Sequence, residues 1–329
     1  MNGQIIKIIS NLYTVKSGDM LYGCTIRGKF RKDNIIPMVG DDVTIDINNN
    51  IITDIHPRKN ELVRPVIANV DIALIITSTK EPDLDLNLLD KLLSVIRIKK
   101  IEPVICFTKI DLLNEKEVAM IDDLKKYYEM IGIRTVYNTE KTEIKKIIKG
   151  NVVVLAGQSG AGKSTLLNSL DEELNIKTDE ISKALGRGKH TTRHVELFEI
   201  SGGYVADTPG FSALSLKNIT KEELRNSFIE FLDYECRFKD CVHKKETDCG
   251  IKSAVSDKLI LESRYKNYLL FLEEVENESS SIFYKKWLWF RNNNKQNWRI
   301  KCWLYSRRHD GWYFCWKCKL YSFWYKENV

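Results

Sequence analysis

The chain has 329 residues, of which 43% are hydrophobic and 29% are charged, with 17 Gly and 6 Pro. This composition excludes collagen-like, disordered and low-complexity proteins, and the length suggests about two or three domains. The longest apolar runs, at 72–76 and 152–156, are much shorter than the roughly 20 residues of a membrane-spanning helix. The first residues lack the features of a signal peptide, so we expect a cytoplasmic protein with no membrane partner.

The positive net charge of +6 is concentrated near the C-terminus. Residues 283–329 hold 11 Lys and Arg against 2 Asp and Glu, and they contain all seven tryptophans. Residues 1–282 are slightly acidic, with a net charge of −3. The overall charge is therefore no argument that the body of the protein binds nucleic acid.

Residues 1–65 consist of short β-segments separated by turns. Five segments are rich in β-branched residues, namely 5–9, 12–15, 21–26, 42–47 and 51–55. Glycine, aspartate and asparagine between them are typical of turns. Five strands at this spacing suit a small barrel such as an OB-fold, although a β-meander packed on the next domain fits the pattern equally well. The residues around 56–58 and 64–65 are expected to form a linker.

From residue 70 onward, apolar strands alternate with helical stretches. The expected strands are 70–77, 103–107, 134–137, 151–156, 195–200 and 203–206, and the expected helices are 84–98, 115–131, 142–149 and 163–170. This alternation predicts an α/β domain with a mostly parallel sheet and helices on both faces. After Gly210 the pattern becomes helical, with a last helix at about 258–276 and no periodicity after residue 281.

In chain order, the first segment with a chemical signature is Thr108, Lys109, Ile110 and Asp111, directly after the strand expected at 103–107. The carboxylate of Asp111 can accept hydrogen bonds from two adjacent N–H groups of guanine, a pair that adenine does not offer. The aliphatic part of Lys109 can lie over the base. Beside a phosphate-binding loop, this segment predicts a guanine nucleotide.

A phosphate-binding loop is predicted at 157–164, where GQSGAGKS matches the GxxxxGK[ST] pattern between an apolar strand and a helix. Its glycines let backbone N–H groups converge on phosphate oxygens, and the helix N-terminus adds partial positive charge. Lys163 would reach the β- and γ-phosphates, and the Ser164 hydroxyl would bind Mg²⁺. The predicted nucleotide-binding residues of this loop are Gly157, Gln158, Ser159, Gly160, Ala161, Gly162, Lys163, Ser164 and Thr165.

The DTPG segment from Asp207 to Gly210 follows an expected strand and fits the DxxG motif of GTPases. Asp207 would hold Mg²⁺ through water, and the Gly210 N–H would contact the γ-phosphate. In ordinary GTPases the phosphate loop precedes the base-reading motif, whereas here 108–111 precede 157–164. The reversed order indicates a circular permutation, which domains tolerate because their termini often lie close together.

Together these motifs resemble the RsgA-type GTPases, also called YjeQ or YloQ, which depend on the small ribosomal subunit. The resemblance rests on the permuted order, the GQSGAGKS loop, GRGKHTT at 186–192, DTPGF at 207–211 and the cysteine–histidine cluster at 236–249, and it covers residues 1 to about 280. It implies an OB-fold, a permuted P-loop GTPase domain and a zinc-binding C-terminal domain. It also implies GTP hydrolysis in late maturation of the small ribosomal subunit, stimulated by that subunit, with GTP, GDP, the subunit and its rRNA as partners.

On this basis we expect four regions in a protein that is a monomer. These are an RNA-binding OB-fold barrel at 1–65, a permuted GTPase domain at 66–215, a helical zinc-binding domain at 216–282 and a Trp- and Lys-rich tail at 283–329. We recognise no counterpart of the tail in the family, and our hypothesis is that it is an out-of-frame or read-through extension. The family also has a second base-contacting motif after the strand at 134–137, where this chain has Asn138, Thr139 and Glu140.

A metal site is predicted at Cys236, Cys241, His243 and Cys249, which place three thiolates and one imidazole within 14 residues. This donor set suits one tetrahedral, structural Zn²⁺ ion per chain. Free thiols with a surface histidine are the alternative, and a disulfide is disfavoured in a reducing compartment.

The predicted catalytic residue is His190. Phe211 follows the DTPG segment, where Ras-like enzymes have the glutamine that orients water, so another group must do so. An imidazole can accept a hydrogen bond from water, and the family resemblance points to the same position; a histidine that contacts only RNA or solvent is the alternative. Thr192, or its neighbour Thr191, would complete the Mg²⁺ shell. The alternative function is an RNA- or ribosome-binding module in which GTP is only a structural or regulatory ligand.

Overall fold

The computed structural model describes all residues except 27–29, 31–35, 64, 172–194, 207–214 and 294–329, and for 279–293 it describes the backbone alone. The chain consists of two compact units, Met1–Val275 and Glu276–Val329. The features described below belong to the first unit, apart from the distal part of the last helix. Among the described residues, every helix is too short or too polar to cross a membrane.

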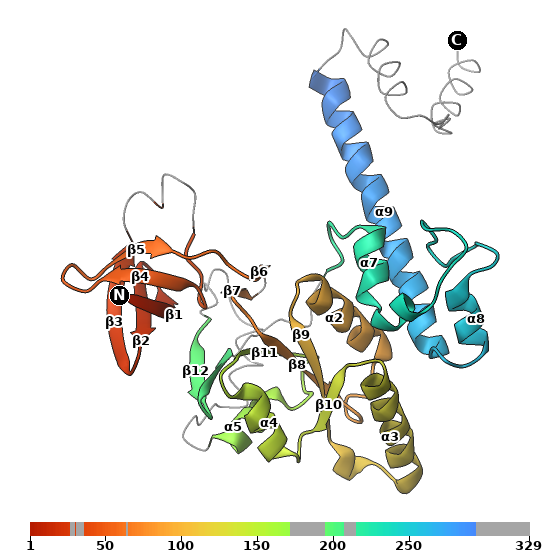
Figure 1. Ribbon diagram of the computed structural model, residues 1–329, viewed down its shortest axis with the longest axis horizontal. Helices are drawn as coiled ribbons and strands as arrows, with labels where there is room; N and C mark the ends of the chain where they lie inside the picture. Colours follow the sequence, from red (N-terminus) through yellow and green to blue (C-terminus); the bar gives the residue numbers. More distant parts are fainter. Residues whose placement is uncertain (27–29, 31–35, 64, 172–194, 207–214, 294–329) are drawn as a thin grey trace. The chain divides into compact units, whose positions relative to one another are not determined.

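The N-terminal strands close into a barrel with the order β1–β2–β3–β5–β4 (Figure 1). The strands are β1 (Asn2–Ile9), β2 (Leu12–Ser17), β3 (Met20–Ile26), β4 (Asp42–Asp46) and β5 (Ile51–Ile55). Alternate residues point into the barrel, as Tyr13 and Val15 of β2 do, because side chains of a strand alternate between its two faces. The parallel pairing of β3 with β5 completes the closure. This confirms the predicted OB-like barrel rather than an open meander.

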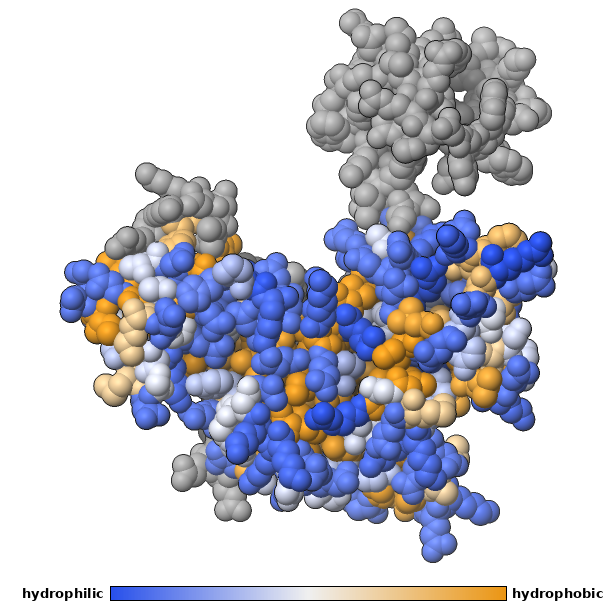
Figure 2. Space-filling model, viewed as in Figure 1, coloured by the Kyte–Doolittle hydropathy of each residue, from blue (hydrophilic) through white to orange (hydrophobic). Residues whose placement is uncertain are grey.

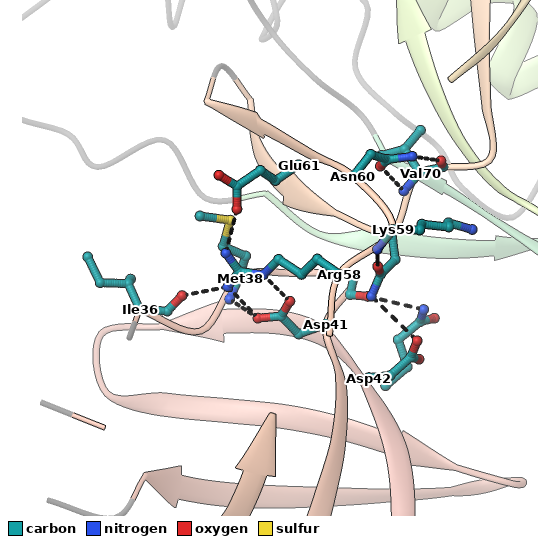
Figure 3. Close-up of polar contacts among 12 residues, drawn as sticks. Ile36, Met38, Asp41, Asp42, Arg58, Lys59, Asn60, Glu61 and Val70 are labelled. Carbon is teal, nitrogen blue, oxygen red and sulfur yellow. Dashed lines mark hydrogen bonds and ion pairs between the residues drawn. The ribbon is translucent and has the colours of Figure 1, made fainter. Parts of the chain in front are cut away.

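The region in which a linker was predicted, around 56–58 and 64–65, includes a short hairpin of β6 (Glu61–Val63) and β7 (Val66–Ala68), and polar contacts attach this region to the barrel (Figure 3). Nε and an Nη of Arg58 donate to the fully buried carboxylate of Asp41 at 2.6 and 2.9 Å. The side-chain amide of Asn60 exchanges two hydrogen bonds with the backbone of Val70, at 2.7 and 2.9 Å. These contacts hold the connection between barrel and sheet in one conformation.

A six-stranded sheet with the order β10–β9–β8–β11–β13–β12 forms the central domain (Figure 1). Its strands are β8 (Ile72–Ser78), β9 (Glu102–Thr108), β10 (Arg134–Tyr137), β11 (Val152–Ala156), β12 (Leu197–Ile200) and β13 (Gly203–Ala206). Five strands are parallel, and β12 is an antiparallel edge strand. All seven residues of β8 are buried, as expected for a strand whose two faces are both covered.

Helices cover both faces of the sheet, which confirms the prediction. They are α2 (Leu86–Ile98), α3 (Glu115–Met130), α4 (Lys141–Ile148) and α5 (Lys163–Leu170). Ala73 and Ile75 of β8 face α2 and α3, whereas Leu74 and Ile76 face α4 and α5. Hydrophilic residues predominate on the molecular face in Figure 2, in agreement with this burial. Helix α2 begins at Leu86, two residues later than predicted, because the Asp85 carboxylate accepts a hydrogen bond from the Leu88 N–H and caps the helix.

The C-terminal region is helical, with α7 (Lys221–Ser227), the 3-10 helix η4 (Ile229–Asp233), α8 (Gly250–Ser256) and α9 (Glu262–Asn293). Aromatic rings fill its core, and the rings of Phe228 and Tyr268 meet edge to face with centroids 5.3 Å apart. The prediction of a last helix at 258–276 was wrong at both ends. Lys258 has a left-handed backbone and follows the end of α8, so α9 starts later; no Pro or Gly interrupts the sequence up to residue 293, so it continues further.

A buried ionic network joins α9 to the central domain. Arg264 of α9 donates two hydrogen bonds to the Glu230 carboxylate of η4, at 2.7 and 2.8 Å, and one to the Asp90 carboxylate of α2, at 2.7 Å. Tyr128 of α3 donates to the same Asp90 oxygen at 3.0 Å, and Asn267 donates to the other at 2.7 Å. The charged members of this network are at most 2% exposed. The network therefore fixes the start of α9 against the helices that cover one face of the sheet.

Candidate nucleotide-binding and metal sites

The predicted phosphate loop connects β11 to α5 at the carboxyl edge of the sheet. Gly157, Gly160 and Gly162 all have positive φ angles, of 128°, 76° and 96°, which residues with a Cβ rarely adopt. At Gly157 a Cβ would also lie 2.1 Å from the carbonyl oxygen of Ile76, so no other residue fits. The N-cap residue of α5 is Gly162, which has no side chain to cap the helix, and the first N–H groups of α5 are suited to phosphate oxygens.

Lys163 lies at the start of α5 and reaches back across the loop. Its ammonium group donates to the carbonyl oxygens of Gly157 and Gln158, at 2.9 and 2.6 Å. Ser164 follows in the first turn and is half-buried, while Thr165 is exposed. A helix N-terminus with a lysine and a hydroxyl in its first turn can bind a polyphosphate with its divalent cation.

The predicted base-reading segment, 108–111, meets this loop through two residues that are 53 positions apart in sequence. The hydroxyl of Thr108, at the end of β9, donates a buried hydrogen bond of 2.7 Å to the carbonyl oxygen of Ala161. The next residue, Lys109, has a left-handed backbone that turns the chain into the short 3-10 helix η1 (Ile110–Leu112). Asp111 of this helix is exposed, so its carboxylate is accessible to a base.

Two further segments lie at the same edge of the sheet. The backbone N–H of Asn138 donates to the carbonyl oxygen of Phe107 at 2.9 Å, which brings the segment after β10 to the end of β9. Thr79, which follows β8, donates through its hydroxyl to the carbonyl oxygen of Thr108 at 2.8 Å. No sequence motif marks Thr79, although the expected parallel sheet places the carboxyl ends of β8, β9 and β11 together.

Several predicted residues lie outside the part of the chain that the structure describes. These are His190, Thr191, Thr192, Asp207 and Gly210. Their roles remain predictions from the sequence and its resemblance.

The four predicted metal ligands form one cluster in the C-terminal region, and their donor atoms all lie within 4.8 Å of one another. Nδ1 of His243 is 3.5, 3.3 and 3.3 Å from the sulfurs of Cys236, Cys241 and Cys249. The sulfurs of Cys236 and Cys249 are 3.8 Å apart. A tetrahedral zinc ion with Zn–S bonds of about 2.3 Å and a Zn–N bond of about 2.0 Å requires S···S and N···S separations of about 3.8 and 3.5 Å. The donor set therefore fits such an ion.

Burial controls the protonation of this cluster. Burial lowers the pKa of His243 to about 4, and burial raises the pKa of the Cys241 thiol to about 12. The imidazole is therefore neutral, as a metal ligand must be, and the thiols need a nearby cation to lose their protons.

Backbone contacts fix the ligand loop against α9. Tyr265 donates through its hydroxyl to the carbonyl oxygen of His243 at 2.6 Å, and Tyr268 donates to that of Val242 at 2.9 Å. His243 itself has a left-handed backbone, with φ 58°, so these bonds hold a conformation that few non-glycine residues adopt. These tyrosines belong to no metal-binding motif, so the sequence pattern alone does not reveal that they support the cluster.

Comparisons with known proteins agree with this geometry. The family described as RsgA GTPase matches residues 55–217, and the family described as RsgA N-terminal domain matches residues 2–52. A protein of Listeria monocytogenes serotype 4b named small ribosomal subunit biogenesis GTPase RsgA 1 is 49% identical over 285 residues, covering 84% of this chain and 98% of its own length. A Clostridium beijerinckii protein named small ribosomal subunit biogenesis GTPase RsgA is 43% identical over 291 residues, covering 85% of this chain and 99% of its own.

Two solved structures are similar along most of this chain. The crystal structure of YjeQ from Thermotoga maritima has a TM-score of 0.72 and 34% identity, and the match covers 83% of this chain and 98% of that one. The structure of YloQ, described as a circularly permuted GTPase, has a TM-score of 0.72 and 35% identity, with 84% and 95% coverage. The permuted order inferred from the motifs is thus found in a solved neighbour.

Proposed function

The chain belongs to the RsgA family of GTPases, and from this membership we propose that it hydrolyses GTP to GDP and phosphate during late maturation of the small ribosomal subunit. We further propose that the subunit stimulates hydrolysis and that both it and its rRNA are binding partners. The names of the relatives support the subunit as partner. A ribosomal partner in turn favours a cytoplasmic location, and we expect a monomer.

The hydrogen bond from Thr108 to Ala161 is the observation that carries the nucleotide-binding part of this proposal. It brings the base-reading segment 108–111 to the phosphate loop 157–164, so one nucleotide can contact both. Asp111 would accept the N–H groups of guanine, and the loop's N–H groups and Lys163 would hold the phosphates.

His190 is proposed to orient the attacking water, since Phe211 offers no polar atom for this task. Ser164 and Thr192 would hold Mg²⁺, with Asp207 acting through water, and the Gly210 N–H would contact the γ-phosphate. Bound Mg²⁺ would neutralise charge on the phosphate oxygens. The protein's own contribution is to align the water and the phosphate chain.

We assign separate roles to the regions of the chain. Residues 1–65 would bind RNA, 66–215 would form the GTPase domain and 216–282 the zinc-binding domain. One Zn²⁺ ion bound by Cys236, Cys241, His243 and Cys249 would stabilise the C-terminal region, and the spacing of the four donor atoms supports this choice of metal.

GTP turnover with and without purified small ribosomal subunits tests the proposal. We expect slow turnover by the protein alone, a clear increase with the subunits, and loss of that increase in His190→Ala. Large subunits added at the same concentration are the control. Equal and negligible rates under both conditions, with intact GTP binding, would favour the alternative of a ribosome-binding module that uses GTP only as a ligand.

A further inference from the structure

Thr79 occupies the position directly after β8, between the base-reading segment and the interior of the domain. It is 8% exposed. Its backbone N–H lies 3.2 Å and its hydroxyl 2.8 Å from the carbonyl oxygen of Thr108. The hydroxyl is also 3.2 Å from the carbonyl oxygen of Lys109, so one proton is shared between two consecutive carbonyl groups.

These two carbonyl groups lie where the chain makes an unfavourable turn. Lys109 has a φ of 62°, a left-handed conformation that is unfavourable for a residue with a Cβ. The turn directs Asp111 away from the strand and into η1. Such a conformation persists where the surrounding structure holds it, and here the bonds to the backbone come from Thr79 and from the Leu112 N–H, which donates to Lys109 at 3.2 Å.

The turn that follows Thr79, residues 80–82, contacts the base-reading segment, α3 and the phosphate loop. Lys109 donates through its ammonium group to the carbonyl oxygen of Glu81. Lys80 pairs with both carboxylate oxygens of Glu117 in α3, at 3.3 and 3.2 Å. Pro82 faces the phosphate loop, since a Cβ added at Gly160 would lie 3.7 Å from its Cδ. The turn is therefore a third element at the nucleotide site, beside the two motifs that the sequence reveals.

We infer that Thr79 is a positioning residue that determines guanine specificity: its hydroxyl fixes the backbone of Thr108 and Lys109 and thereby aims the carboxylate of Asp111 at the base. Thr79 acts through this backbone and does not touch the nucleotide. The inference rests on the proposed function, namely that the site binds a guanosine nucleotide. It predicts that loss of the Thr79 hydroxyl weakens the preference for guanine over other bases, in addition to any effect on the stability of the fold.

Thr79→Val tests this role because valine keeps the branched shape and removes the hydroxyl. Thr79→Ser keeps the hydroxyl and should retain the wild-type behaviour. Thr77→Val is the matched control, since Thr77 lies near the end of β8, two residues before Thr79, and is also 8% exposed, but its hydroxyl contacts the Ile75 carbonyl oxygen of its own strand at 3.5 Å.

The measurement is the affinity of the full chain for GDP and for inosine diphosphate, by competition with a fluorescent GDP analogue. Inosine lacks the 2-amino group, so one of the two N–H groups that face Asp111 is missing. We expect Thr79→Val to bind GDP about 3- to 10-fold more weakly, the effect of one lost hydrogen bond, and to bind inosine diphosphate with a smaller loss. The preference for GDP should fall accordingly, and Thr79→Ser and Thr77→Val should keep it.

An unchanged preference in Thr79→Val, or an equal fall in Thr77→Val, would overturn the inference. A partly unfolded variant does not confuse the result, because both affinities are measured on the same folded fraction. If the wild-type protein itself shows no preference for GDP over inosine diphosphate, the proposed function fails, and this outcome is distinct from a failure of Thr79 alone.

Discussion

Replacing Arg264 by methionine would leave the buried carboxylates of Asp90 and Glu230 without the cation that they face. Methionine fills much of the same space over the Phe228 ring, so the change is mainly electrostatic. Removing one partner of a buried ion pair costs about 3–5 kcal/mol in the free energy of unfolding. The Arg264 and Asp90 side chains are 2% and 1% exposed, so solvent screens the remaining charges little, and we expect a loss within this range.

Urea unfolding followed by far-UV circular dichroism measures this loss. Lys266→Met is the matched control on the same helix, because Lys266 is 67% exposed and its pair with Glu262 should contribute at most about 1 kcal/mol. Adding Asp90→Asn and Glu230→Gln to Arg264→Met should recover part of the stability, since these changes remove the uncompensated charges. A cost below about 1 kcal/mol for Arg264→Met, or one equal to that of the control, would refute the reasoning.

Three further substitutions or deletions test other parts of the account. Gly157→Ala should abolish GDP binding in a calorimetric titration, because its Cβ would collide with the Ile76 carbonyl oxygen; wild-type affinity would show that the loop does not need this geometry. Cys249→Ser should lower the zinc content of the purified protein from one ion per chain, whereas Cys24→Ser in the barrel core should not; equal zinc in both variants would argue against the site. Deleting residues 283–329 should leave GDP affinity and the unfolding midpoint unchanged, because Val275 is the last core residue among the described side chains of α9, and a fall in either would show that the tail has a structural role.

Much of the fold was predictable because its elements carry strong local patterns. The central strand β11 and residues 72–76 of β8 are continuous apolar runs, and α3 is capped by Asn114, whose side chain forms a capping box with Glu117. The hairpin of β6 and β7 was missed because its strands have three residues each and Pro65 lies between them. The extension of α9 was missed because no hydrophobic periodicity marks the sequence after residue 281, although no Pro or Gly interrupts it up to residue 293.

The candidate site was predictable where the chemistry demands residues at fixed spacing. Phosphate binding by backbone N–H groups requires glycines, and tetrahedral metal binding requires four donors, so both leave a sequence motif. Thr79 belongs to no sequence motif, because only the pairing of β8 with β9 brings it beside Thr108. Arg264 belongs to no sequence motif either, since its partners Glu230 and Asp90 are 34 and 174 residues away in sequence.

A competition titration with a fluorescent GDP analogue tests most directly whether segments 108–111 and 157–164 together bind one guanosine nucleotide. We expect GDP to displace the analogue at far lower concentrations than ADP, and Asp111→Asn to lose most of this preference, since an amide cannot accept both N–H groups of guanine. Displacement by ADP at the same concentrations as GDP, or an unchanged preference in Asp111→Asn, would contradict the account.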